Sequence, residues 1–152
     1  MRALVRGVLA LSLLFGTARW AAAGCDLTDP ATATAVANAR SAADTACGGC
    51  ANATNHGQYV SCVAQQANGN ASLPTECRGF VKRCAARSTC GKPGFITCCK
   101  TKSDGTTTKC STKHDRAGDG TICTDHAPPG GHACVGSHQS CCDACTSSGC
   151  AP

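Results

Sequence analysis

The order of apolar and polar residues predicts three helices in the first half of the chain. The first covers Ala31 to Cys47, a run of strong helix formers. Asp29 is placed to cap its N-terminus, and Pro30 occupies the first helical position. Gly48-Gly49 marks its end. One stripe of this segment carries Val36, Arg40, Ala43, Cys47 and Cys50.

Two shorter helices are expected to follow. Asn55 is placed to cap a helix that runs to about Ala67, and Pro74 opens another that runs to about Arg87. Apolar and sulfur-bearing residues share one face of each helix. These are Tyr59, Cys62 and Val63 in the former, and Cys77, Phe80, Val81 and Cys84 in the latter. Cysteine occupies positions where a larger protein places leucine, so these faces should be both packed and cross-linked.

After Cys90 the pattern changes to one typical of a β-hairpin. Phe95 to Lys102 and Thr106 to Thr112 flank Asp104-Gly105, a dipeptide favoured in type I′ turns. This register places Cys99 opposite Cys110, at a separation that a disulfide accepts, and directs Cys98 to the other face. The vicinal pair would then cross-link two layers. The same register sets Lys100 against Lys109, an unfavourable pair of like charges.

The remainder, from Ala117, is rich in turn signals. Glycine and proline recur at Gly118, Gly120, Pro128 to Gly131 and Gly136, and a short turn is expected at Cys141 to Cys145. The predicted fold class is therefore a small disulfide-rich α+β protein. A helical lobe (24–90) and a hairpin-and-loop lobe (91–152) would form one compact unit.

The N-terminus has the three parts of a secretory signal peptide. Arg2 and Arg6 give a positive start, Val8 to Phe15 form a short apolar run, and Ala21-Ala22-Ala23 ends in a small-residue cleavage site. The apolar run is too short to span a bilayer. Removal of residues 1–23 leaves a mature chain of 129 residues.

A competing interpretation is a bacterial lipoprotein anchored through Cys25, because Ala-Ala-Gly-Cys matches a lipobox. Lipidation of Cys25 would leave fifteen thiols, an odd number in an oxidising compartment. Plain export, to the periplasm or the outside, is therefore the favoured prediction.

Sixteen cysteines follow the predicted leader, and large apolar residues are few. The mature chain has only twelve of them: Leu27, Val36, Tyr59, Val60, Val63, Leu73, Phe80, Val81, Phe95, Ile96, Ile122 and Val135. Such a composition needs covalent support to fold, and exported thiols at this density are expected to be oxidised. The disulfide candidates are Cys25, Cys47, Cys50, Cys62, Cys77, Cys84, Cys90, Cys98, Cys99, Cys110, Cys123, Cys134, Cys141, Cys142, Cys145 and Cys150. Their connectivity stays open at this point.

Positive charge is concentrated in the middle of the chain. The mature part has 11 Lys/Arg and 9 Asp/Glu, a net of +2, but residues 78–116 alone hold ten bases and two acids. The basic residues are Arg78, Lys82, Arg83, Arg87, Lys92, Lys100, Lys102, Lys109, Lys113 and Arg116. This band predicts loose attraction to an anionic envelope polymer or an acidic protein, although a merely solvated face is the simpler alternative. Nucleic acid is disfavoured, because aromatic residues for base stacking are scarce.

Histidines near the C-terminus suggest a second chemistry. His126, His132 and His138 recur among cysteines, and imidazole and thiolate are ligands for zinc or copper. Their spacing matches no ordinary zinc signature, so solvated loop histidines are the main alternative. The C-x-x-C pairs at Cys47 and Cys142 favour structural over redox use, because Cys47 falls at a helix C-terminus, where the dipole disfavours a thiolate.

No serine nucleophile elbow, catalytic carboxylate pair or phosphate loop is present, so the chain is not predicted to be an enzyme, and no cofactor is expected. Two segments, His56 to Val63 and Leu73 to Cys99 with its Arg-Cys-Ala-Ala-Arg-Ser-Thr-Cys-Gly-Lys-Pro-Gly core, carry a resemblance. They resemble uncharacterised Cys-rich secreted proteins predicted from bacterial genomes. The resemblance covers about a third of the mature chain. It implies a bacterial source and export, and no activity.

The sequence thus favours an exported, disulfide-stabilised structural or interaction module whose basic middle faces an anionic partner. Metal binding or sequestration by the tail histidines is one alternative. A small inhibitor or toxin that presents a tightly held loop, such as Gly91 to Gly94, is another.

The mass of the purified protein before and after reduction and alkylation tests these expectations. The mature chain should begin at Gly24, carry no lipid, and take up sixteen alkyl groups only after reduction. Substantial alkylation without reductant would contradict the disulfide prediction and favour a metal or redox protein.

Overall fold

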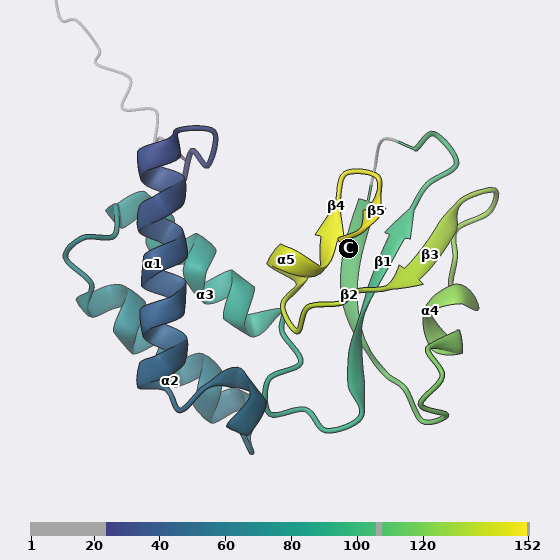
Figure 1. The fold of residues 1–152 in the computed structure, drawn as a ribbon, viewed down its shortest axis with the longest axis horizontal. Helices are drawn as coiled ribbons and strands as arrows, with labels where there is room; N and C mark the ends of the chain where they lie inside the picture. The colour runs from purple at the N-terminus through teal and green to yellow at the C-terminus, as the bar shows by residue number, and fades with distance from the viewer. Residues whose placement is uncertain (1–23, 106–107, 152) are drawn as a thin grey trace, which may run out of the picture.

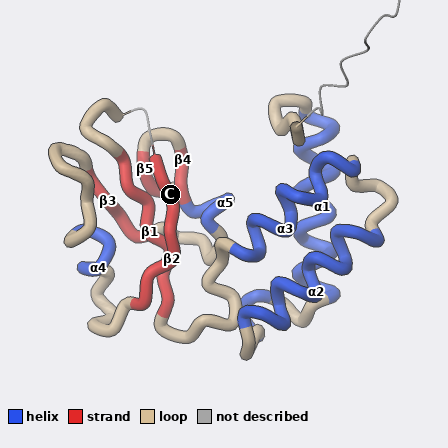
Figure 2. The backbone as a smooth tube through the Cα atoms, turned by 180° about the vertical axis from the view of Figure 1, so that it is seen from behind, coloured by secondary structure: helices blue, strands red, loops and turns tan. Residues whose placement is uncertain are grey.

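The computed structural model describes residues 24–105 and 108–151. The predicted signal peptide therefore lies outside the described residues, as do Thr106 and Thr107 of the predicted hairpin. The described chain folds into two neighbouring lobes, with the three long helices on one side and the strands on the other (Figures 1 and 2). This arrangement confirms the predicted α+β class.

Three helices build the first lobe: α1 (Pro30–Ala46), α2 (His56–Gly69) and α3 (Arg78–Ala86). Single 3-10 turns, η1 (Cys50–Asn52) and η2 (Thr75–Cys77), precede α2 and α3. Both predicted caps are in place. Asp29 accepts a hydrogen bond from Thr32 N at 2.9 Å, and Asn55 accepts one from Gln58 N at 3.0 Å.

The core of this lobe is made of small residues. Leu73 and the valines Val36, Val63 and Val81 are its largest buried aliphatic side chains. Alanines on all three helices fill the rest, which allows the helices to approach closely. Three disulfides close the same lobe, Cys25–Cys77, Cys47–Cys62 and Cys50–Cys90. Cysteine thus takes the place of leucine, as the sequence pattern predicts.

The second lobe is organised around a three-stranded antiparallel sheet in the order β2-β1-β3. Its strands are β1 (Phe95–Thr101), β2 (Thr108–His114) and β3 (His132–Val135). The predicted hairpin register is confirmed, since Cys99 lies opposite Cys110 and Lys100 opposite Lys109. Shorter elements surround the sheet: α4 (Thr121–Thr124), α5 (Cys141–Ala144), β4 (Cys145–Thr146) and β5 (Gly149–Cys150).

The turn between β1 and β2 differs from the predicted type I′ turn. Gly105 has a φ of 67°, but no described residue other than glycine has a positive φ, so Asp104 does not adopt the conformation that type I′ requires. Instead, Gly105 N donates to Lys102 O at 2.9 Å and closes a turn over residues 102–105. The loop between the paired strands is longer than two residues, which removes the need for the tighter turn.

Cys98 and Cys99 cross-link opposite faces of the sheet, as the alternation of side chains predicts. Cys98 is bonded to Cys123 of α4, and Cys99 is bonded to Cys145 of β4. Cys99 does not pair with Cys110, despite facing it across the hairpin. Cys110 is bonded to Cys141 of α5 instead.

One disulfide and several backbone hydrogen bonds join the two lobes. Cys84 of α3 is bonded to Cys142 of α5. Beside this bond, Thr89 N donates to Gln139 O at 2.8 Å and Cys141 N donates to Arg87 O at 3.1 Å. No helix in the described part of the chain is both apolar and long enough to cross a bilayer.

Truncation of Val81 to alanine should show how much the small core contributes. Val81 is 1% exposed, and the lost burial and the cavity should lower the free energy of unfolding by about 2 kcal/mol. Chemical denaturation without reductant would measure this change. Leu27, which is 40% exposed, is the control. If Leu27→Ala costs as much as Val81→Ala, the core does not lie where the structure places it.

Candidate functional site

Every cysteine lies in the described part of the chain, and all sixteen are paired. None of the bonds joins the two ends of a C-x-x-C motif. Cys47 and Cys50 reach separate partners, as do Cys142 and Cys145. This supports the structural interpretation of both motifs over the redox one. The eight disulfides are Cys25–Cys77, Cys47–Cys62, Cys50–Cys90, Cys84–Cys142, Cys98–Cys123, Cys99–Cys145, Cys110–Cys141 and Cys134–Cys150.

The ten basic residues of the middle segment are distributed over both lobes. Two of them are engaged in contacts within the fold. Arg87 donates from Nη2 to Cys110 O at 2.5 Å, which ties the end of α3 to β2. Lys92 donates from Nζ to Ser88 O at 3.3 Å and lies 5.9 Å from the centre of the Phe95 ring. Arg78, Lys82 and Arg83 belong to α3.

Three lysines do gather, on one face of the hairpin. Lys100 lies directly opposite Lys109, and Lys113 lies opposite Ile96 on the same strand pair. Because side chains alternate along a strand, these three project from the face that also carries Cys98. We call this surface the lysine face. The eight residues that alternation places there include no acid: Ile96, Cys98, Lys100, Lys109, Ser111, Lys113, Ala133 and Val135.

The charged form of Lys100 is disfavoured within the lysine face. The pKa of Lys100 is lowered, first by desolvation of its ammonium group and then by the positive charge of Lys113. Lys109 is exposed, whereas Lys100 and Lys113 are partly buried. An anion that binds between these ammonium groups would be attracted by all three and would relieve their mutual repulsion.

The tail histidines lie on different elements. His126 Nδ1 lies 3.0 Å from Ile122 O at α4, and His132 Nε2 of β3 lies 3.3 Å from Ser148 O. His138 lies in the segment before α5. Among the described residues, one group of three potential metal-ligating atoms is close enough to share an ion, and it contains none of these histidines. A histidine metal site therefore stays a prediction from the sequence.

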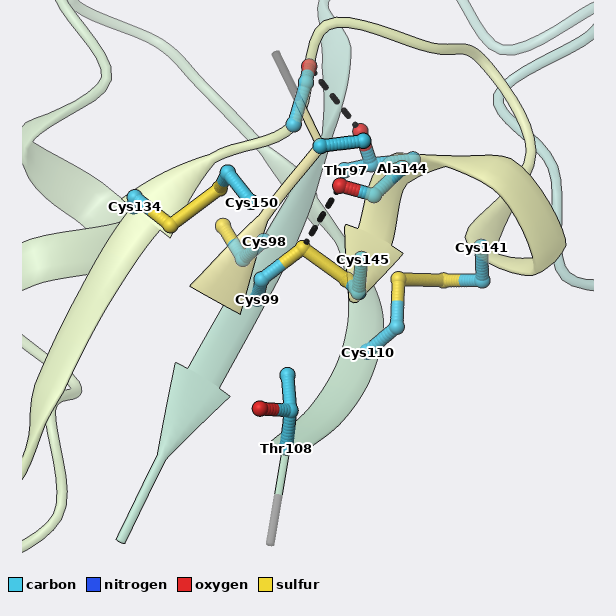
Figure 3. The surroundings of a disulfide bond; sticks show 12 residues. Thr97, Cys98, Cys99, Thr108, Cys110, Cys134, Cys141, Ala144, Cys145 and Cys150 are labelled. Atoms are coloured by element: carbon cyan, nitrogen blue, oxygen red, sulfur yellow. Dashed lines mark hydrogen bonds between the residues drawn. A yellow bond between two sulfur atoms is a disulfide. The ribbon is translucent and has the colours of Figure 1, made fainter. Parts of the chain in front are cut away.

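That group consists of the sulfur atoms of Cys99, Cys110 and Cys145, which all lie within 4.8 Å of one another. Figure 3 shows the two disulfides to which they belong, side by side between the sheet and the C-terminal segment. Cys99 Sγ also lies 3.1 Å from the carbonyl oxygen of Ala144. Since all three sulfurs are in disulfide bonds, none is a thiolate ligand in this state.

A cleft of about 360 Å³ lies between the lobes, a feature that sequence reasoning missed. Its polar wall joins α1 to α5. Arg40 forms a two-pronged ion pair with Asp143, in which Nη1 donates to Oδ1 at 2.8 Å. On the same wall, the Tyr59 hydroxyl donates to Asp44 Oδ1 at 2.8 Å. The volume is at the low end of the range for ligand pockets.

The chemistry of the cleft is dominated by these two pairs. Burial and the bond to the Asp44 carboxylate raise the pKa of Tyr59, while Asp143 raises the pKa of Arg40. The only local signal in the sequence was the spacing of Arg40 and Asp44, four residues apart on one helix face. Asp143 is 103 residues from Arg40, so no local pattern could connect them.

Comparison of the chain with protein families, curated proteins and solved structures finds no match.

Titration of Tyr59 tests the geometry of the cleft. Tyr59 is the single tyrosine of the chain, so tyrosinate absorbance reports on it alone. Its pKa should lie well above the ordinary value of about 10. Asp44→Asn keeps the acceptor but removes the charge, and should move the pKa back toward the ordinary value. Asp29→Asn, distant on the cap of α1, should leave it unchanged.

The raised pKa of Tyr59 also predicts that the protein loses stability at alkaline pH. The folded state holds the Tyr59 proton more tightly than the unfolded state does. The contribution of protonated Tyr59 to the free energy of unfolding is therefore fully present below about pH 10. It is lost as the pH rises through the folded-state pKa. Denaturation midpoints at increasing pH should therefore fall more steeply in the wild type than in Tyr59→Phe. Equal slopes would contradict the shift.

Proposed function

We propose that this protein is an exported binding module that engages an anionic polymer of the cell envelope through the lysine face. The observation that carries the proposal is the convergence of Lys100, Lys109 and Lys113 on one face with no acid among the neighbouring strand positions. The disulfide-rich fold supports it as a rigid scaffold, because a face fixed by covalent bonds loses little entropy on binding.

Repulsion within the lysine face favours an anionic occupant over a neutral one. Desolvation and Lys113 already disfavour the charged form of Lys100. An anionic group placed among the three ammonium groups favours their charged forms, so binding gains both attraction and relief of repulsion between like charges. A repeating polyanion suits this surface better than a single small ion, because the three lysines extend along two strands.

Export is part of the same proposal. Eight disulfides are consistent with an oxidising compartment. The expected leader and the resemblance to bacterial Cys-rich secreted proteins point to the periplasm or the outside of a bacterium. The proposed role is binding rather than catalysis. An acidic protein as the partner, a histidine metal site and an inhibitory loop at Gly91–Gly94 stay alternative predictions.

Retention on an immobilised acidic envelope polysaccharide tests the proposal. At low ionic strength the wild type should be retained, and salt should elute it as screening shortens the range of attraction. Lys100→Gln/Lys109→Gln should weaken binding by about 30-fold, since each lysine at an anionic surface contributes about 1 kcal/mol. No retention of the wild type at low salt would reject the proposal.

The matched control is Lys82→Gln/Arg83→Gln. It also removes two positive charges, one from a partly buried and one from an exposed residue, but from α3 instead of the hairpin. This variant should bind within about threefold of the wild type if the site is the lysine face. Equal weakening of both variants would mean that net charge, and not this face, determines retention. Preferential capture of acidic proteins over polysaccharide would favour the protein partner.

A further inference from the structure

Two neighbouring disulfides connect the sheet to the C-terminal segment. Cys99–Cys145 joins β1 to β4, and Cys110–Cys141 joins β2 to α5 (Figure 3). The sulfur of Cys110 lies within 4.8 Å of both sulfurs of the other bond. In the described chain no other disulfide has a third sulfur this close to both of its own.

A second pairing of the same four cysteines is compatible with the backbone. Cys99 and Cys110 face each other directly in the hairpin, where Cα atoms lie about 4.5–5.5 Å apart. Cys141 and Cys145 are separated by the single turn of α5, a rise of about 6 Å. Both separations fall in the range of about 4.4–6.8 Å that a disulfide accepts.

We propose that these four cysteines form a thiol–disulfide exchange site for small thiols. Exchange converts the pairing Cys99–Cys145 and Cys110–Cys141 into Cys99–Cys110 and Cys141–Cys145. The substrate class is a low-molecular-weight thiol, of which glutathione and free cysteine are examples.

The exchange proceeds in three balanced steps. The thiolate of the small molecule attacks Cys141 Sγ, which forms a mixed disulfide and releases Cys110 as a thiolate. Cys110 attacks Cys99 Sγ, so the Cys99–Cys110 bond forms and Cys145 leaves as a thiolate. Cys145 then attacks Cys141 and expels the small thiolate. The number of disulfides is unchanged, and the thiol is regenerated.

Arg87 favours the first step. Its Nη2 donates to Cys110 O at 2.5 Å, which holds a permanent positive charge beside Cys110. A thiolate next to an arginine is stabilised, and a thiol of lower pKa is the better leaving group. Attack at Cys141 with release of Cys110 is therefore preferred over attack at Cys110. The released thiolate then lies next to the Cys99–Cys145 bond.

Exchange would alter the connection between the lobes. In the observed pairing, the vicinal residues Cys141 and Cys142 bond to β2 and to Cys84 of α3, so α5 covalently links the two lobes. In the second pairing, the bond from α5 to β2 is absent, while Cys84–Cys142 remains. A small thiol would thereby loosen one wall of the interlobe cleft without reducing the protein.

The proposal is tested by a variant in which a thiol of the protein itself starts the exchange. Cys141→Ala leaves Cys110 as a thiol beside the Cys99–Cys145 bond. The thiol should migrate to Cys145 as Cys99–Cys110 forms. The folded variant is quenched in acid, unfolded and labelled with N-ethylmaleimide, then reduced and cleaved at lysine, arginine and aspartate. The label on the peptide 143–152 should be at least one tenth as strong as that on the peptide 110–113, and a weaker signal overturns the proposal.

Two further measurements keep the test decisive. Cys25→Ala is the matched control, because the thiol that it leaves on Cys77 has no neighbouring disulfide within the same distance, and its label should stay on Cys77. The wild type treated with reduced glutathione decides the matter if Cys141→Ala fails to fold. Electron-transfer fragmentation should then find Cys110 bonded to Cys99. Treated protein in which Cys110 is bonded only to Cys141 overturns the proposal.

Discussion

Disulfide bonds between distant residues are the constraint on which the rest of this structure depends. The bonded partners are 15 to 58 residues apart in sequence, so each bond closes a long loop and removes freedom from the unfolded chain. The apolar core alone is modest, since alanine and valine make up much of it. Adjacent cysteines that bond to different partners strengthen this constraint. Cys98-Cys99 fixes both faces of the sheet, and Cys141-Cys142 fixes α5 between the lobes.

Most local signals in the sequence were reliable, but the turn type was not. Asp29 and Asn55 cap the helices that they were predicted to cap, because a capping bond spans three residues. The hairpin register follows from centring the two strands on Asp104-Gly105 and is equally local. The turn type was wrong because type I′ needs a positive φ at both of these residues, whereas only Gly105 of the two has one.

Features that depend on contacts between the lobes could not be predicted. Cys99 faces Cys110, yet it bonds to Cys145 because the C-terminal segment returns to the sheet beside β1. The Arg40–Asp143 ion pair joins residues 103 positions apart. The basic residues of the middle segment are likewise distributed over both lobes. Some of them lie on α3, where the helical repeat points side chains in different directions. Three lysines lie on one face of the hairpin, because side chains alternate along a strand.

The opposed lysines show how covalent bonds and surface chemistry are connected. A like-charged pair directly across a hairpin is unfavourable, and a shift of register would remove it. The register is held through the C-terminal segment, because Cys99–Cys145 ties β1 to it and Cys110–Cys141 ties β2 to it. The disulfides therefore maintain a charge arrangement that a hairpin held only by its own side-chain pairs would tend to avoid. The bonds that stabilise the sheet therefore also support the proposal of an anionic partner at the lysine face.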